Sequence, residues 1–400
     1  MRGRILRLSL ATLEAALAAA LAVTLVGCAA TKSDTGTASK EDKTPIKIGA
    51  VVSLTGTYAG LGEPEKNTIE MEVARVNEAG GVNGRPIEVI IEDDATDDAK
   101  ANAAASKLIE KDGVVAVIGA TGTGGTMAMR DVITRAGVPQ VSMAGGTVIT
   151  NPVAELVWAT PWSNTIVAPF EITAMQKDGI KKVALISDTG GFGKDGRAVF
   201  TEAAKKAGLE IVSDQTFNPN DADMSAQLTN IKKSGAEAIV IWNAGKEAST
   251  VVKNAKDLGI ELPLYGSHGN ARKEFVEGAG DAAEGFRFAA GKILMPEAYG
   301  KDSEAYKVGT DFVSRYQTEF GAPPSTFAGH AYDALYIVVD AAKRVKGDVT
   351  PESLSAEIAK TSGLVGIGGT FTFSETDHNG LTANDLTLYE VKDGNWSIVQ

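Results

Sequence analysis

The chain has 400 residues, of which 44% are hydrophobic and 22% are charged. These are ordinary values for globular proteins, so they exclude a wholly disordered chain and a protein built of many membrane spans. The formal net charge is −12, and an acidic chain repels phosphate backbones, so we expect no nucleic-acid partner. The 44 glycines follow no Gly-X-Y period and therefore indicate many tight turns.

Residues 1–27 have the features of an export signal. Three arginines precede an apolar stretch that is long enough for a signal-peptide core and too short to span a bilayer. The ending Leu25-Val26-Gly27-Cys28 resembles the lipobox of bacterial lipoproteins, which implies cleavage before Cys28 and a lipid on its sulfur. An ordinary signal peptide with an incidental cysteine is the alternative. Residues 28–45 are polar and rich in Ser, Thr and Lys, so we expect a flexible tether.

Short apolar strands then alternate with amphipathic helices. In the first series, we expect strands at 47–52, 87–91, 114–118 and 139–142, and helices at 68–77, 97–111 and 126–135. In the second series, we expect strands at 182–187, 210–213, 238–242 and 263–265, and helices at 196–207, 225–233 and 247–258. Buried strands followed by covering helices are typical of layered α/β folds, so the pattern predicts two α/β units.

The last part of the chain differs from these two series. Its sequence predicts long helices at 303–320 and 327–344 and a shorter one at 351–360. The tail alternates apolar and polar residues with Gly and Asn turns, which predicts antiparallel strands at 369–373, 386–391 and 397–399.

The turn at 191–196, Gly-Phe-Gly-Lys-Asp-Gly, fits the dinucleotide-binding pattern, because it follows a strand and opens a helix. Against this, three residues separate the strand from the first glycine, and Lys194 and Asp195 crowd the turn. An exported protein also meets little nicotinamide cofactor. We therefore interpret the segment as a glycine-rich turn beside a cleft, and expect no cofactor and no catalytic residue.

The candidates for metal ligands are equally weak. The histidines at 268, 330 and 378 have no metal-ligand spacing. The acidic stretch 92–98 lacks the alternate spacing and central glycine of a calcium loop, and is better explained by a strand end and helix N-caps. We expect no metal site.

Three loops that leave strand ends combine glycines with hydroxyl side chains: 53–62, 119–126 and 142–147. In α/β sheets, ligands bind outside the carboxyl ends of the strands. Glycine lets the backbone approach a ligand, and free N–H groups at helix starts favour an anion. Each loop alone could be a simple turn, but together they predict a seat for a carboxylate or a similar small anion.

Several motifs resemble the periplasmic binding proteins for branched-chain amino acids, and the resemblance runs from about 46 to 400. The motifs lie at 47–50, 53–62, 77–85, 116–119 and 329–334, and the hairpin tail fits as well. The resemblance implies a type I binding fold, in which two doubly wound α/β lobes are joined by a three-segment hinge, with crossings near 160, 290 and 365. Lobe I would then contain 46–160 and 291–365, and lobe II 161–290 and 366–400.

The same resemblance implies a function. A small carboxylate-bearing ligand would be captured by hinge closure and delivered to an ABC permease in the membrane. The protein would be an extracytoplasmic monomer, anchored by the lipid on Cys28 in the periplasm or at the cell surface. A ligand-sensing domain of a receptor would use the same fold and is an alternative. A dinucleotide-dependent enzyme that uses the 191–196 turn is a second alternative.

The resemblance also assigns site residues. The carboxylate seat falls on Thr123, Ala144 and Gly146 or Thr147. The aromatic side chain that closes over the ligand falls on Phe192, and a second pocket aromatic falls on Phe327. Leu61 replaces a family tyrosine, although Tyr58 lies nearby, and Trp162 and Trp242 are placed at the hinge and at a strand end facing the cleft.

One position departs from the family pattern. Amino-acid binders of this family have a glutamate where this chain has His268, and that glutamate pairs with the ligand ammonium. An imidazole cannot replace the negative charge, and an unpaired buried ammonium is costly. Ala244 stands at a second position that contacts the amine. We therefore predict an apolar or aromatic acid without a free α-ammonium. The alternatives are a branched-chain amino acid as ligand, and a loop histidine outside the pocket.

Overall fold

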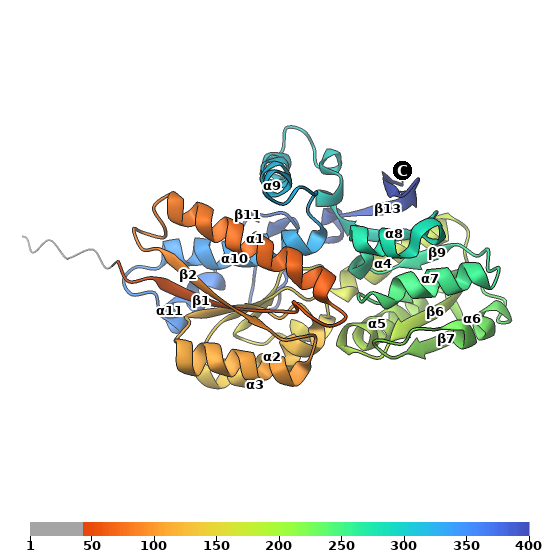
Figure 1. Ribbon diagram of the computed structural model, residues 1–400, viewed down its shortest axis with the longest axis horizontal. Coiled ribbons are helices and arrows are strands. Elements are labelled where there is room, and N and C mark those ends of the chain that lie inside the picture. Colours follow the sequence, from red (N-terminus) through yellow and green to blue (C-terminus); the bar gives the residue numbers. More distant parts are fainter. Residues whose placement is uncertain (1–42, 400) are drawn as a thin grey trace, which may run out of the picture. The chain divides into compact units, whose positions relative to one another are not determined.

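The computed structural model describes residues 43–399. It confirms the two-lobed α/β fold, with one mainly parallel sheet in each lobe and helices on both faces of each sheet (Figure 1). The predicted signal sequence, Cys28 and all but the last residues of the predicted tether lie outside the described residues.

The first lobe contains a five-stranded parallel sheet in the order β2-β1-β3-β4-β5. The strands are β1 (Ile46–Val52), β2 (Ile87–Asp93), β3 (Ala116–Gly119), β4 (Gln140–Ser142) and β5 (Val157–Ala159). Helices α1 (Ala59–Glu78) and α10 (Thr326–Arg344) cover one face, and α2 (Asp98–Lys107) and α3 (Thr123–Ala136) cover the other (Figure 1). Strand β1 shows why both faces are apolar: Ile48 and Ala50 pack toward α1 and α10, whereas Val51 packs toward α2 and α3.

The second lobe contains a seven-stranded sheet in the order β7-β6-β8-β9-β10-β13-β14, in which β13 runs antiparallel to both of its neighbours. The strands are β6 (Lys182–Asp188), β7 (Glu210–Phe217), β8 (Ala238–Trp242), β9 (Leu264–Gly266), β10 (Arg287–Gly291), β13 (Leu386–Lys392) and β14 (Asn395–Ile398). One face packs against α4 (Asn164–Lys177) and α5 (Gly191–Ala207). The other packs against α6 (Ser225–Lys232), α7 (Glu247–Asp257) and α8 (Lys273–Ala279).

The described chain passes between the two lobes three times: between β5 and α4, between β10 and α10, and between β12 (Thr370–Phe371) and β13. The remaining elements are α9 (Glu304–Phe320), α11 (Pro351–Ile358), β11 (Leu364–Val365) and β12 (Thr370–Phe371). Phe373 still packs with Trp158 of β5, with ring centroids 6.4 Å apart. We therefore propose that the third lobe boundary lies between 373 and 386 instead of near 365.

Both sheets have the same order around their first strand. Strand β1 lies between β2 and β3, and β6 lies between β7 and β8. The connections leave β1 and β3, and likewise β6 and β8, toward opposite faces of the sheet. A crevice opens at such a reversal, outside the carboxyl ends of the strands. The topology therefore places one crevice in each lobe.

Candidate ligand-binding site

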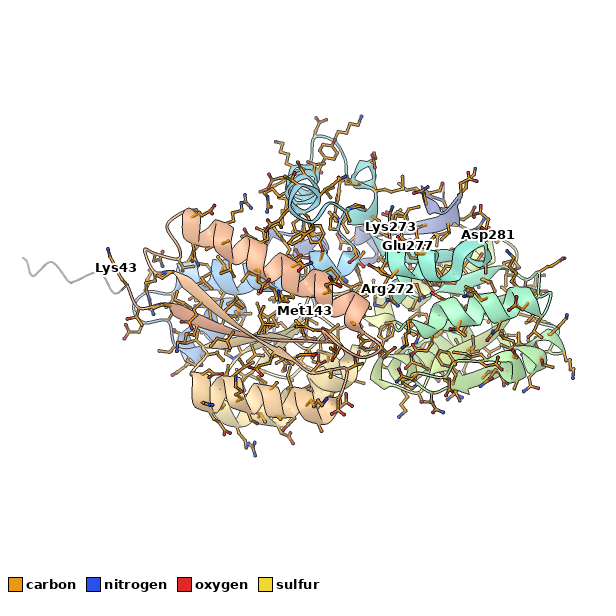
Figure 2. The ribbon with its side chains drawn as sticks, in the orientation of Figure 1. Lys43, Met143, Arg272, Lys273, Glu277 and Asp281 are labelled. Carbon is orange, nitrogen blue, oxygen red and sulfur yellow. The ribbon has the colours of Figure 1, made fainter. Side chains whose placement is uncertain are left out.

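A small cavity, with about 20 Å³ of free space for water-sized molecules, lies where the two crevices meet. This is room for about one water molecule, so the cavity must widen to hold a larger ligand. Loops at the carboxyl ends of strands from both sheets form most of its wall, and the start of α10 completes it; Met143, which follows β4, is labelled in Figure 2. The lining residues are Tyr58, Leu61, Thr121, Gly122, Thr123, Met143, Ala144, Gly145, Pro161, Phe192, Ala244, His268, Gly269, Phe327 and His330.

None of these fifteen lining residues is Asp, Glu, Lys or Arg. The polar atoms of the cavity are instead hydroxyl groups, two imidazoles and backbone groups of glycine-rich loops. A charged ligand group must therefore be held by uncharged hydrogen-bond donors and by the partial charges of helix ends. This restricts which charges the cavity can accept.

Thr123 marks the place where an anion fits best. It is the first residue of α3, after Gly122 at the helix N-cap, and no side chain caps this helix start. Its hydroxyl oxygen is buried without a hydrogen-bond partner. Helix N-termini present unpaired N–H groups and a positive partial charge, so a carboxylate is favoured here.

A buried acid behind the seat supports this assignment. Thr121 donates its hydroxyl hydrogen to Oε2 of Glu65 at 2.5 Å, and the pKa of Glu65 is raised well above its ordinary value by burial. Burial therefore favours the neutral form of Glu65, which carries no negative charge that would repel a bound carboxylate.

His268 lies in the wall contributed by the seven-stranded lobe, in the short 3₁₀ helix η3 (His268–Asn270) after β9. Its ring meets Phe192 edge-on, with centroids 5.2 Å apart. Both ring nitrogens are buried without a partner, and burial lowers the pKa of His268 to about 3. The imidazole is therefore neutral at physiological pH, and its unpaired nitrogens are available to a ligand.

His330 also lines the cavity, from α10 on the other lobe. Its ring meets Trp162 edge-on at 5.5 Å and Phe327 edge-on at 5.8 Å, and its Nδ1 is buried without a partner. Burial and the nearby His268 lower the pKa of His330 to about 3. Sequence reasoning did not assign this residue to the site. It stands in a helix that is buried on most sides, so hydrophobic periodicity does not show which face meets a cavity.

Seven residues assigned to the site from the sequence line this cavity: Thr123, Ala144, Phe192, His268, Phe327, Tyr58 and Leu61. Four others do not line it: Gly146, Thr147, Trp162 and Trp242. Trp162 packs behind His330, and Trp242 donates its indole N–H to Asn164 at 3.2 Å.

Thr147 does not line the cavity, and its backbone N–H is bound by a carboxylate of the protein itself. Asp195 of α5 accepts hydrogen bonds from the backbone N–H of Thr147 at 2.7 Å and of Val148 at 3.3 Å. The same carboxylate accepts a bond from Asn164 at the hinge, at 2.6 Å. We call these three bonds the Asp195 clasp. Thr147 and Val148 follow β4 of the five-stranded sheet and Asp195 belongs to the other lobe, so these two bonds hold the lobes together. The bond to Asn164, the first residue of α4, fixes the Asp195 carboxylate within its own lobe.

Two further contacts join the lobes. Thr57, after β1, donates its hydroxyl hydrogen to Glu247 of α7 at 2.7 Å. Arg272, at the start of α8 (Figure 2), packs against Gly60 of α1: its Nη1 lies 3.0 Å from the place that a Cβ on Gly60 would take. The described structure is therefore a closed form of the cleft.

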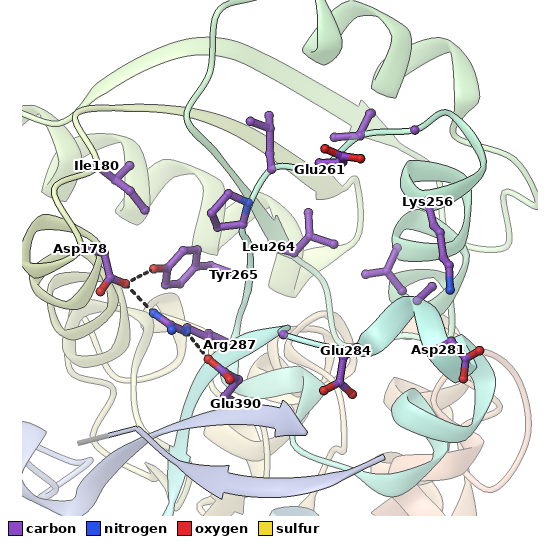
Figure 3. A pocket seen from close by; sticks show the side chains of 17 residues that line it. Asp178, Ile180, Lys256, Glu261, Leu264, Tyr265, Asp281, Glu284, Arg287 and Glu390 are labelled. Carbon is purple, nitrogen blue, oxygen red and sulfur yellow. Dashed lines mark hydrogen bonds and ion pairs between the residues drawn. The ribbon is translucent and has the colours of Figure 1, made fainter. Parts of the chain in front are cut away.

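A larger hollow, of about 700 Å³, lies on the seven-stranded lobe near the amino ends of its strands. At one end of it, three charged side chains pair with one another (Figure 3): Asp178 accepts bonds from Tyr265 at 2.5 Å and from Arg287 at 2.6 Å, and Arg287 also pairs with Glu390. The interlobe cavity, by contrast, holds several unpaired buried polar atoms. We therefore place the ligand site between the lobes.

A cavity enclosed between two doubly wound α/β lobes defines a solute-binding protein of the type I fold. The family model described as periplasmic binding protein matches residues 45–395, and the chain belongs to this family. Such proteins are extracytoplasmic solute binders, which favours binding over the dinucleotide-dependent alternative. No helix within residues 43–399 is long and apolar enough to cross a membrane.

Individual relatives agree with this assignment. Leu/Ile/Val-binding protein homolog 3 of Brucella melitensis is 27% identical, with 87% of this chain and 92% of the relative covered. An extracellular ligand-binding receptor from Rhodopseudomonas palustris HaA2 matches with a TM-score of 0.83 at 27% identity, over 89% of this chain and 99% of that one. The branched-chain amino acid transporter substrate-binding protein LivJ of Streptococcus pneumoniae, solved with isoleucine, matches with a TM-score of 0.78 at 29% identity, over 89% and 99%.

Proposed function

We propose that the chain is the solute-binding component of an ABC importer, and that its ligand is a small apolar or aromatic carboxylic acid without a free ammonium group. The observation that carries this proposal is the composition of the cavity wall. It combines an unpaired hydroxyl at a helix N-terminus with two neutral imidazoles, and none of its lining residues is acidic.

The carboxylate of the ligand would bind at Thr123. The unpaired hydroxyl can donate to it, and the start of α3, which no side chain caps, offers further N–H donors. This part of the ligand is shared with the leucine, isoleucine and valine that appear in the names of the relatives.

No lining residue of the cavity carries a carboxylate that could pair with the ammonium group of those amino acids. Ala244 cannot make a polar side-chain contact, and burial keeps His268 neutral, with a pKa of about 3. A buried ammonium without a carboxylate partner costs several kcal/mol, on the order of a thousandfold in affinity. The wall therefore supports a ligand that lacks this group.

The body of the ligand would lie among apolar side chains from both lobes. Phe192 belongs to the seven-stranded lobe, whereas Leu61, Met143 and Phe327 belong to the other. Only the closed form contacts the ligand from both sides, so binding energy favours closure. The closed form would then deliver the ligand to the permease. We further propose a monomer, anchored through a lipid on Cys28, which lies outside the described residues.

A ligand panel tests the proposal. Purified protein, unfolded and refolded to remove carried-over ligand, is titrated with isocaproate and hydrocinnamate, and with the amino acids leucine and phenylalanine. We expect the acids to raise the melting temperature and the amino acids to leave it unchanged. Stabilisation by leucine with no effect of either acid would contradict the proposal. A titration with NAD is expected to be flat, and a response would instead favour the enzyme alternative.

Affinity for the acid is expected to depend on pH in one direction. In an open cleft the two imidazoles reach water and regain a pKa near about 6.5, whereas the closed cavity lowers the pKa of His268 and of His330 to about 3. Below pH ~6.5 the two rings must then lose their protons before the cleft can close. Affinity therefore falls by up to about tenfold for each histidine when the pH is lowered by one unit, and it is constant above pH ~7.

Calorimetric titration between about pH 5 and pH 8 measures this dependence. The control is His268→Gln, in which a single titrating imidazole remains and the slope is halved. Asp188, whose pKa burial raises to about 6, is paired with Gly190 and Asn243 of its own lobe, so closure does not alter those bonds. A constant affinity over this range would show that the rings stay buried in the open form.

A further inference from the structure

The two cavity histidines come from different lobes and are both incomplete in their hydrogen bonding. His268 follows β9 in the seven-stranded lobe, and His330 lies on α10 in the other. Both nitrogens of His268 and Nδ1 of His330 are buried without a partner. Buried polar atoms are nearly always paired in proteins, so orphaned atoms that line a cavity indicate the polar groups of its occupant.

We propose that His330 is a second specificity-determining residue, and that His268 and His330 together select a hydroxyl group on the ligand, close to its carboxylate. The proposal rests on the proposed function, because it adds a neutral polar group to the same acid. The chemical class is therefore a hydroxy acid with an apolar or aromatic body.

The chemistry of neutral imidazole favours a hydroxyl over the other small polar groups. Each neutral ring offers one N–H donor and one bare nitrogen acceptor. A keto oxygen only accepts and an ammonium only donates, so each pairs with both rings only when the two facing nitrogens are of the same kind, both N–H or both bare. A hydroxyl accepts from the N–H of one ring and donates to the bare nitrogen of the other, and thereby joins the two lobes.

The position of the hydroxyl follows from two adjacent glycines. Nε2 of His268 lies 2.4 Å from the place that a Cβ on Gly145 would take. The hydroxyl oxygen of Thr123 lies 2.7 Å from the corresponding place at Gly146. Because these glycines are neighbours in one loop, the imidazole lies beside the carboxylate seat. The hydroxyl therefore belongs on a carbon close to the carboxylate, as in phenyllactate.

The ring of His330 is held by its neighbours independently of any ligand. It meets Trp162 and Phe327 edge-on, and its backbone oxygen accepts a bond from Thr160 at 3.0 Å. His330→Phe would keep this aromatic packing and remove both ring nitrogens. His330→Gln would keep one donor and one acceptor. The two variants separate the packing of this side chain from its hydrogen bonding.

The experiment measures affinities for three pairs of acids with and without the hydroxyl: phenyllactate and hydrocinnamate, leucate and isocaproate, and lactate and propionate. We expect the wild type to prefer the hydroxy acid of at least one pair by about tenfold or more. We expect His330→Phe to weaken that hydroxy acid by about tenfold and its partner by less than about threefold, with His330→Gln in between.

His378 supplies a matched control. It is a buried histidine outside the cavity, stacked on Trp158, and its Nδ1 is paired with the carbonyl of Val157 at 2.9 Å. His378→Phe is expected to leave the ratio of affinities within each pair unchanged. This ratio is read only from folded protein, so a general loss of stability does not affect it.

Three results would overturn the inference. A wild type that binds both members of every pair equally removes the hydroxyl preference and leaves the proposed function intact. A His330→Phe variant that weakens both members by the same factor assigns His330 a structural role. A wild type that binds no member of any pair, or binds phenylalanine or leucine in their place, overturns the proposed function and this inference together.

Discussion

Replacing His268 with glutamate is expected to exchange the ligand preference of the cavity, from hydrocinnamate to phenylalanine, by about a hundredfold or more in the ratio of affinities. The new carboxylate would stand beside the seat at Thr123, where an α-ammonium of the ligand can pair with it. A ligand with only a carboxylate would instead meet a second negative charge in a cavity that offers no cation among its lining residues. Calorimetric titration of both ligands into both proteins gives the ratio.

His268→Gln is the matched control, because glutamine is similar in size to glutamate and carries no charge. It is expected to weaken the acid modestly and to gain no affinity for the amino acid. If His268→Glu bound hydrocinnamate as the wild type does, the side chain at 268 would not face the ligand.

Gly191→Val is expected to prevent full closure of the cleft and to weaken every ligand by about a hundredfold. Gly191 begins α5 in one lobe, and a Cβ at this position would lie 2.7 Å from the backbone nitrogen of Gly124 in the other. Backbone cannot yield at this distance, so the lobes must stay apart. The open form has no such clash, and the melting temperature of the empty protein should change little.

X-ray scattering with and without saturating ligand distinguishes the states, since the wild type should become more compact and the variant should not. Gly300→Val is the control, because nothing lies within 4 Å of the place that a Cβ on Gly300 would take. Unchanged affinity together with normal compaction in Gly191→Val would show that the ligand-bound form does not need this contact.

Much of the fold was readable from the sequence, because most strands are apolar runs with clear turns on both sides. The exceptions have physical reasons. Strand β10 has only five residues, two of them alanine, and is defined by pairing with β9 and β13. Helix α4 contains Pro169 and no clear polar face. Helix α5 begins at Gly191 instead of 196, because its glycine-rich first turn is packed against the other lobe.

The site was readable only where family motifs mark it. Glycines and hydroxyl side chains indicated the loop at 119–126, and the family resemblance assigned Thr123 within it. The resemblance also drew attention to His268, which departs from the family pattern. His330 had no such signal within a buried helix. The position of Thr147 depends on a bond to Asp195, 48 residues later in the chain, and no local pattern encodes that contact.

The Asp195 clasp separates two properties that binding proteins usually combine. Its bonds to Thr147 and Val148 join the lobes without involving a residue that lines the cavity, so we expect them to add the same free energy to closing whatever the ligand is. In the proposed function, His268, His330 and Phe192 would distinguish one ligand from another, whereas Asp195 would act on all of them alike. Substitutions in the cavity wall could therefore change the preferred ligand and leave the contribution of Asp195 to closing unchanged. A substitution of Asp195 could equally adjust the affinity for all ligands together to the ligand concentration in the surroundings.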